Sequence, residues 1–157
     1  MNKERLLRLA SRMDKVAVEH FDIGLWHSMT PACVLGHGAL IREFREAGLN
    51  IEIHETGASV IFKDENGNRY TGGRAGAQFF DIPEWHAAIL FMADGNDRRT
   101  SFFYESGHTE EITPQQVADA LRKYVETDGK SADYANDLYV ASWHNEEGHN
   151  EEDEDED

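Results

Sequence analysis

The chain has 157 residues, of which 39% are hydrophobic, and this is the size and composition of a single folded domain. Its formal charge of −16 disfavours direct binding to the phosphates of nucleic acids or membranes and favours basic partners. The N-terminal segment lacks the apolar core of a signal peptide, no stretch reaches the roughly 20 apolar residues of a membrane span, and the only cysteine, Cys33, excludes an intramolecular disulfide. We therefore expect a cytoplasmic protein.

The acidic residues are concentrated at the C-terminus. Residues 145–157 contain nine carboxylates and no lysine or arginine, which leaves a charge of −7 for residues 1–144. We interpret residues 1–144 as one α+β domain and residues 145–157 as an acidic, disordered tail. The side chains predicted to bind a partner are Glu146, Glu147, Glu151, Glu152, Asp153, Glu154, Asp155, Glu156 and Asp157.

The first third of the chain predicts two helices. Leucine and methionine side chains recur at helical spacing in residues 3–18, which predicts an amphipathic helix. Residues 21–26 lack that spacing and are interpreted as an apolar loop on the core. Thr30-Pro31 is a helix start signal and a glycine follows residue 47, so a second helix is predicted over residues 31–47.

The middle of the chain changes to a β pattern. Residues 49–71 contain short runs of branched residues and the turn signal Asn66-Gly67, which is typical of an antiparallel meander. A short helix is predicted over residues 75–80, and another begins at residues 81–83. The inward face of this second helix is predicted to consist of Trp85, Ala88, Ile89 and Met92.

The remaining segments complete the predicted fold. Residues 94–98 are interpreted as a turn and residues 100–104 as a short strand. Thr113-Pro114 opens a capping box, and the apolar positions that follow predict a helix. Residues 127–144 suggest a last short helix or strand. The predicted class is α+β, with four or five helices packed around a small antiparallel meander in a single domain.

Three segments resemble a loose family of small bacterial and phage proteins that has no assigned activity. They are Cys33-Val34-Leu35-Gly36-His37, Phe44-Arg45-Glu46-Ala47-Gly48-Leu49 and Thr113-Pro114-Gln115-Gln116-Val117-Ala118. The resemblance covers residues 1–126, which leaves the acidic tail as an addition. It implies an origin in a bacterium or a phage, and it supplies no catalytic residues.

Cys33 and His37 are the candidate catalytic pair. Because they are four residues apart at the start of the second predicted helix, they share a helix face, and a helix N-terminus stabilises a thiolate. The flanking Gly36 and Gly38 instead indicate close packing, in which a free cysteine behaves as a small buried hydrophobe. No third orienting residue is identifiable, so a small Cys/His hydrolase is kept as an alternative function.

No metal site and no cofactor are predicted. The histidines and carboxylates do not have the spacing of the known zinc or calcium motifs. Residues 72–76 contain three glycines, but no Walker-type lysine follows, and a turn explains them as well. Surface positions or satisfied core positions are expected for the histidines His20, His27, His54, His86 and His108.

The acidity, the clustered tail and the missing catalytic motifs favour a non-enzymatic binding or inhibitor protein. Closely spaced carboxylates imitate a phosphate backbone, so the expected partner is a basic surface of a host nucleic-acid-binding protein of the defence type. A phage or mobile element would encode such an inhibitor, which would act in the host cytoplasm. Alternatively, the tail folds back on the basic residues of the first helix, Arg5, Arg8, Arg12 and Lys15.

A third class of function stays open beside the inhibitor and the hydrolase. The chain can be a homo-oligomeric structural or accessory protein in which a surface aromatic, Trp26 or Trp143, lies in the self-interface.

Overall fold

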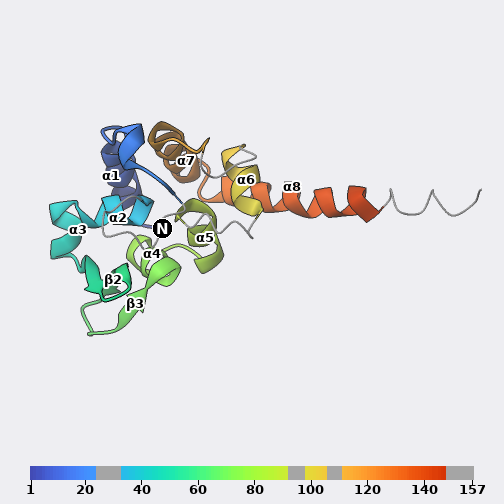
Figure 1. Cartoon of the computed structure of the whole chain (residues 1–157). Coiled ribbons are helices and arrows are strands. Elements are labelled where there is room, and N and C mark those ends of the chain that lie inside the picture. The colour runs from blue at the N-terminus through green and yellow to red at the C-terminus, as the bar shows by residue number, and fades with distance from the viewer. Residues whose placement is uncertain (24–32, 92–97, 106–110, 148–157) are drawn as a thin grey trace, which may run out of the picture.

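The computed structural model describes residues 1–23, 33–91, 98–105 and 111–147 (Figure 1). Its class is α+β, as the sequence predicts, with helices around a three-stranded antiparallel sheet. Several predicted features lie outside the described residues: part of the loop at 21–26, including Trp26, the helix start at Thr30-Pro31, and most of the turn at 94–98.

In chain order, the helices of the described residues are α1 (Lys3–Met13), η1 (Val18–His20), α2 (Val34–Ala39), α3 (Arg42–Glu46), α4 (Gly72–Phe80), α5 (Glu84–Phe91), α6 (Arg99–Tyr104), α7 (Pro114–Glu126) and α8 (Lys130–Glu147). The strands are β1 (Leu49–His54), β2 (Gly57–Lys63) and β3 (Arg69–Thr71). The sheet and α8 lie at opposite ends of the molecule, with α4 and α5 between them (Figure 1).

The predicted helix over residues 3–18 is shorter in the structure. It ends at Met13, and the chain turns through Asp14 before Ala17 takes an extended conformation. β-branched residues at 16 and 18 disfavour continuation, and the Asp14 carboxylate binds Arg122 of α7. The helix therefore stops where its end is tied to α7, against which α1 packs.

The predicted helix over residues 31–47 is two helices in the structure. The break is at Ile41, whose extended backbone (φ −72°, ψ 121°) separates α2 from α3. The bend turns both Ile41 and Phe44 into the core. Two glycines in α2 lower its helix propensity, and Gly38 lets Leu9 of α1 pack closely, with its Cδ1 3.3 Å from the place of a Cβ.

The sheet is the predicted meander, with strand order β1-β2-β3. Leu49, Phe62 and Tyr70 are partners across the three strands and face the core. The Asn66-Gly67 turn is confirmed: the Gly67 N–H donates to the Asp64 carbonyl at 3.1 Å, and Gly67 has a φ of +82°. α4 packs against β2 and β3 and joins the sheet to the rest of the core.

The prediction for the inward face of α5 is confirmed in part. The buried positions are His86, Ala87, Ile89, Leu90 and Phe91, whereas Trp85 and Ala88 are half-buried and Met92 lies outside the described residues. α5 contacts α4, α6 and α7, and a helix surrounded in this way has no single apolar stripe to detect.

The strand predicted over residues 100–104 is helix α6. Its aromatic residues suit a strand by composition, but Thr100 and Tyr104 are buried one turn apart. Tyr104 donates its hydroxyl to the Leu90 carbonyl at 2.8 Å, which ties α6 to α5. Tertiary packing therefore overrides the local β preference.

The start of α7 agrees with its prediction, whereas α8 is longer than predicted. The capping box is confirmed: the Gln116 N–H donates to the Thr113 hydroxyl, and the Gln116 side chain accepts from the Thr113 N–H. The short helix or strand predicted over residues 127–144 is the 18-residue α8. α8 continues through Glu147, so its last turn includes the first residues of the predicted tail, because glutamate favours a helix.

The backbone at Gly48 predicts a strong dependence of stability on that glycine. Gly48 has a φ of +108°, and a Cβ there would lie 2.2 Å from the Lys63 carbonyl oxygen. We expect Gly48→Ala to lower the free energy of unfolding by about 3 kcal/mol in urea titrations. Gly67→Ala is the control, because a Cβ there meets nothing within 4 Å, and it should cost about 1 kcal/mol. Equal losses would contradict the steric explanation.

Candidate functional site

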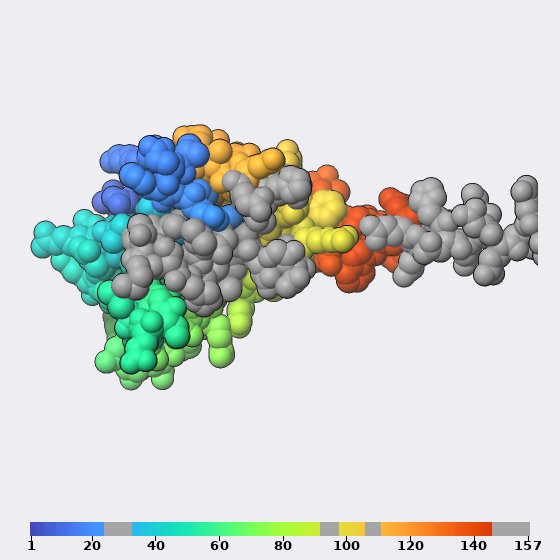
Figure 2. Space-filling view, viewed as in Figure 1, coloured from blue at the N-terminus to red at the C-terminus, as the bar shows by residue number. Residues whose placement is uncertain are grey.

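The corner between α7 and α8 sets the direction of α8. Gly129 has a φ of +84°, and its N–H donates to the Tyr124 carbonyl at 2.9 Å. Immediately after the corner, Ala132 and Ala135 are buried, so the first turns of α8 pack on the body. The later turns run past α6 and out of the body (Figures 1 and 2). α8 is therefore anchored at one end and exposed at the other.

His86 holds the base of α8. Its Nε2 lies 2.9 Å from the Asp133 carboxylate of α8, and its Nδ1 lies 2.7 Å from the Tyr124 hydroxyl of α7. Because a carboxylate only accepts, Nε2 carries the hydrogen, and in the neutral ring Nδ1 accepts from the Tyr124 hydroxyl. Burial, together with the Asp133 charge, raises the pKa of Tyr124 and keeps this hydroxyl a donor. One buried ring thus links α5, α7 and α8.

Four apolar side chains of α8, which we name together the α8 stripe, are Tyr134, Leu138, Tyr139 and Trp143. Tyr134 and Leu138 share one side of the helix, and Tyr139 and Trp143 share another, because residues four apart lie one above the other. Tyr134 is 64% exposed, Trp143 50% and Leu138 37%. Tyr139 contacts Phe102 of α6, with ring centroids 6.1 Å apart, and Trp143 on the next turn at 4.9 Å. The stripe therefore begins against the body and continues past it.

A small cleft lies beside the first half of the α8 stripe, between α6, α7 and α8. Its volume is about 70 Å³. Its apolar lining includes Phe102, Phe103, Ala120 and Leu138, and the charged groups of Glu105 and Lys123 lie at its edge. An apolar cleft next to exposed aromatic side chains is the arrangement found where one protein receives a side chain of another.

The charge of α8 and of the residues after it is almost entirely negative. No lysine or arginine follows Lys130 in the sequence, whereas eleven aspartates and glutamates do. Of the predicted partner-binding carboxylates, Glu146 and Glu147 lie in the last turn of α8. The other seven, at 151–157, lie outside the described residues. The exposed end of α8 therefore leads directly into the most acidic segment of the chain.

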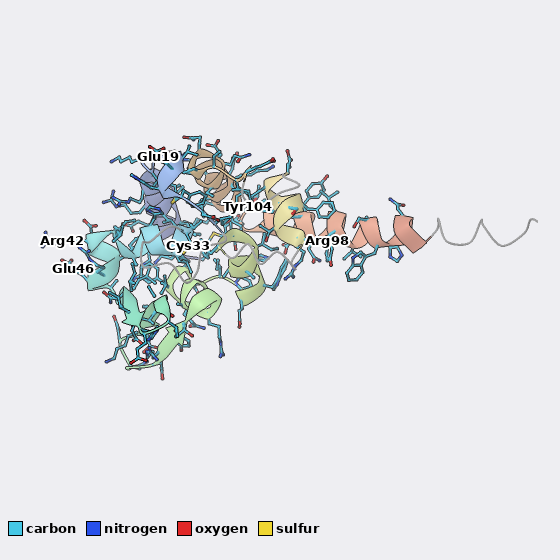
Figure 3. The ribbon with its side chains drawn as sticks, viewed as in Figure 1. Glu19, Cys33, Arg42, Glu46, Arg98 and Tyr104 are labelled. Atoms are coloured by element: carbon cyan, nitrogen blue, oxygen red, sulfur yellow. The ribbon has the colours of Figure 1, made fainter. Side chains whose placement is uncertain are left out.

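The candidate catalytic pair does not have the geometry of an active dyad. Cys33 caps α2, is 4% exposed, and its Sγ accepts the Gly36 N–H at 3.3 Å. His37 Nε2 lies 2.9 Å from the His20 carbonyl, and its buried Nδ1 has no hydrogen-bond partner among the described residues, so neither ring nitrogen is bonded to the thiol. Burial raises the pKa of the Cys33 thiol. Figure 3 shows Cys33 inside the body at the start of α2, away from α8.

The basic residues of α1 mostly have partners in the body. Lys3 pairs with Asp128, the Arg5 guanidinium donates to the Phe79 carbonyl at 2.8 Å, and Arg8 pairs with Glu43. A groove of about 640 Å³ beside α1 and α3 is lined by charges of both signs. Because α8 also points away from α1 (Figure 1), these observations give little support to a tail folded back on α1.

Within the described ranges, no three His, Cys, Asp or Glu side chains gather closely enough to hold a metal ion. No helix among the described residues has the length and apolar character needed to cross a bilayer.

Comparisons with known proteins return no relative. No family model matches the chain, and no curated protein and no solved structure matches it. The resemblance to small bacterial and phage proteins therefore stays a prediction, and the functional argument depends on the site itself.

Sequence reasoning missed most of this site. It assigned partner binding to the tail alone, and it treated His86 as an isolated histidine. The spacing of Tyr134 and Leu138, and of Tyr139 and Trp143, was a usable signal, because positions four apart share a helix face. The contact between His86 and Asp133 had no signal, because 47 residues separate the two.

The His86 hydrogen bonds predict a specific cost of removing that ring. We expect His86→Ala to lower the free energy of unfolding by about 3 kcal/mol, because it leaves a cavity and an unpartnered buried Tyr124 hydroxyl. Hydrogen exchange should also accelerate at the base of α8, residues 132–136. His54→Ala is the control, since His54 is exposed and should change stability by less than about 0.5 kcal/mol. Unchanged exchange in α8 would contradict the anchoring role.

The burial of Cys33 predicts an unreactive thiol. In the folded protein at pH 8, we expect a thiol reagent such as DTNB to label Cys33 at least about a hundredfold more slowly than in urea, because the raised pKa and burial both disfavour attack. Fast labelling of the folded protein at neutral pH would restore the hydrolase hypothesis.

Proposed function

We propose that the protein is a non-enzymatic inhibitor that acts in the cytoplasm by covering the basic surface of a nucleic-acid-binding protein. The observation that carries this proposal is α8 itself: a helix that leaves the body, exposes aromatic side chains, ends in Glu146 and Glu147 and is followed in the sequence by seven more carboxylates. The suggested phage or bacterial origin makes a host defence factor the expected target.

Electrostatics supports a basic target. Eleven carboxylates follow Lys130 with no basic residue among them, so this end of the chain repels nucleic acid and attracts lysine-rich and arginine-rich surfaces. Carboxylates spaced closely along a chain present negative charge as a phosphate backbone does. A protein whose groove binds phosphates will therefore bind this segment in the same groove, with an affinity that falls as salt rises.

The enzyme alternative has less support from the geometry. The Cys33 thiol is buried and its pKa is raised by that burial. Tyr124, His86 and Asp133 are hydrogen-bonded in series, as a nucleophile, a base and an orienting carboxylate are in a catalytic triad. However, Tyr124 is fully buried and its hydroxyl donates to His86. A nucleophile must reach a substrate, and neither side chain does.

Self-association has weaker support than a basic partner. The α8 stripe would suit a second copy by its apolar character. However, each copy carries a charge of −16, so pairing brings like charges together. A basic partner removes that repulsion and is the better occupant.

The test is competition with nucleic acid. Nuclease-treated host lysate is passed over the full-length protein and over a variant in which the seven acidic residues of 151–157 are replaced by their amides. We expect the wild type to capture nucleic-acid-binding proteins that duplex DNA displaces and that elute at moderate salt. The amide variant keeps the chain length and should lose most of this capture.

Two results would overturn the proposal. One is capture of the same proteins by both variants at the same salt, which would place the function in the body. The other is capture that DNA does not displace, because a protein that imitates nucleic acid must compete with DNA for the same surface of the target.

A further inference from the structure

We infer that the outer edge of β1 binds an extended segment of a partner protein, which adds an antiparallel strand to the sheet and alternates apolar with basic side chains. In this mode of recognition, main-chain hydrogen bonds supply affinity and alternate side chains supply specificity. The sheet lies at the opposite end of the molecule from α8 (Figure 1), so the inference does not depend on the proposed function.

The register of the sheet determines which main-chain groups of β1 face outward. β1 is an edge strand, because it pairs with β2 alone. Lys63 donates its N–H to the Gly48 carbonyl at 3.1 Å, and in an antiparallel pair every second residue along the strand is bonded in this way. The residues between the bonded positions, Leu49, Ile51 and Ile53, therefore direct their N–H and C=O groups away from β2.

The second half of this edge is accessible. Leu49 is fully buried beside α2, where a Cβ on Gly38 would lie 3.8 Å from the Leu49 Cδ2, whereas Ile51 is half-buried and Ile53 is 68% exposed. Burial thus decreases along β1 toward the turn at its end. Among the described residues, no group hydrogen-bonds to the outward N–H and C=O groups of Ile51 and Ile53. These groups are therefore available to an added strand.

The two faces of β1 specify the side chains of the added strand. Ile51 and Ile53 share the core face, because residues two apart in a strand point to the same side. A residue directly opposite either isoleucine places its side chain on that same face, so an apolar side chain there covers exposed apolar surface. The residues between these positions point to the other face, beside Glu52, whose side chain is 35% exposed. The two faces thus favour alternation in the partner.

The charge of this hairpin favours basic residues beside Glu52. Residues 46–62 contain three glutamates and no lysine or arginine. Arg69 of β3 and His54 both approach Glu52 at its Oε1. The second carboxylate oxygen, Oε2, is left for a lysine or arginine of the added strand, and opposite charges on neighbouring strands attract.

A second copy of the chain fits this edge less well than a basic partner. Two β1 strands related by a two-fold axis can pair Ile51 of one copy with Ile53 of the other, which uses the accessible half of both edges. That register places the two Glu52 side chains directly opposite each other, and like charges at opposite positions are destabilising. A shift toward the start of β1 instead pairs Ile53 with Leu49, beside which α2 already lies.

The experiment uses three peptides of the same sequence and charge. The parent peptide has about seven residues in which valine and lysine alternate. One derivative carries N-methyl groups on its valines, and the other carries the same number on its lysines. In antiparallel addition, a residue opposite Ile51 or Ile53 exchanges both hydrogen bonds with it, so the valine N–H groups face β1 and the lysine N–H groups face away.

Binding is measured by titrating each peptide into isotope-labelled full-length protein and following the amide signals by NMR. We expect the parent and the lysine-methylated peptide to shift the signals of Ile51 and Ile53 and to slow hydrogen exchange at both N–H groups. The valine-methylated peptide should bind at least about tenfold more weakly. Equal binding of all three peptides, or shifts confined to residues outside β1, would overturn the inference. Loss of binding on lysine methylation alone would exclude antiparallel addition.

Two substitutions separate the edge from the net charge. Ile53→Lys removes apolar surface from the edge and places a cation there, as natural edge strands do to prevent pairing. Val18→Lys is the matched control, since Val18 is 64% exposed on η1 and the charge changes equally. We expect Ile53→Lys to weaken binding of the parent peptide about tenfold and the control to bind as the wild type does. Circular dichroism checks folding, and equal losses in both variants would contradict a role of the edge.

Light scattering tests whether a second copy occupies the edge. A monomeric wild type at the concentrations of the titration supports a partner strand. If the wild type is dimeric and Ile53→Lys is monomeric, a second copy pairs with β1 and the inference is overturned.

Discussion

The hydrogen bonds of His86 determine where α8 begins and how it leaves the body. The ring is buried among helices and satisfies both of its nitrogens with groups from α7 and α8. Leaving a nitrogen of this buried ring without its partner costs free energy, which favours the observed placement of α8. The exposed end of α8 and its stripe extend from this contact. The surface of α8 at the edge of the molecule thus depends on a polar contact inside it.

Charge is divided between two parts of the chain with different roles. In the body, carboxylates have cationic partners: Arg122 beside Asp14 lowers the pKa of that carboxyl, and Lys3 has the same effect on Asp128. These pairs cross-link helices that are distant in sequence. After Lys130 the chain contains no cation, so carboxylates there have no neighbour in sequence to neutralise them. Basic residues of the body thus pair with carboxylates within it, whereas the C-terminal charge has no cation close to it in sequence.

The sequence predicted the elements whose signals are local and missed those decided by packing. The capping box at Thr113 and the turn at Asn66-Gly67 depend on residues within four positions of each other, and both are confirmed. Residues 100–104 have a β-type composition, but contacts with α5 and α8 make them a helix. In the site, the acidic residues were visible from composition. The His86 contact was not, because chain folding alone brings its partners together.

The last turn of α8 places Glu146 and Glu147 at the negative end of a helix. The peptide dipoles of a helix sum to a partial negative charge at the C-terminus, so anionic side chains there work against the helix that carries them. A cation held at this end offsets both the side-chain charges and the dipole. Neutralisation of the acidic end is thus coupled to helical order in the final turn, because whatever neutralises the charge also stabilises that turn. The free energy of that ordering is part of the free energy with which a cation binds there.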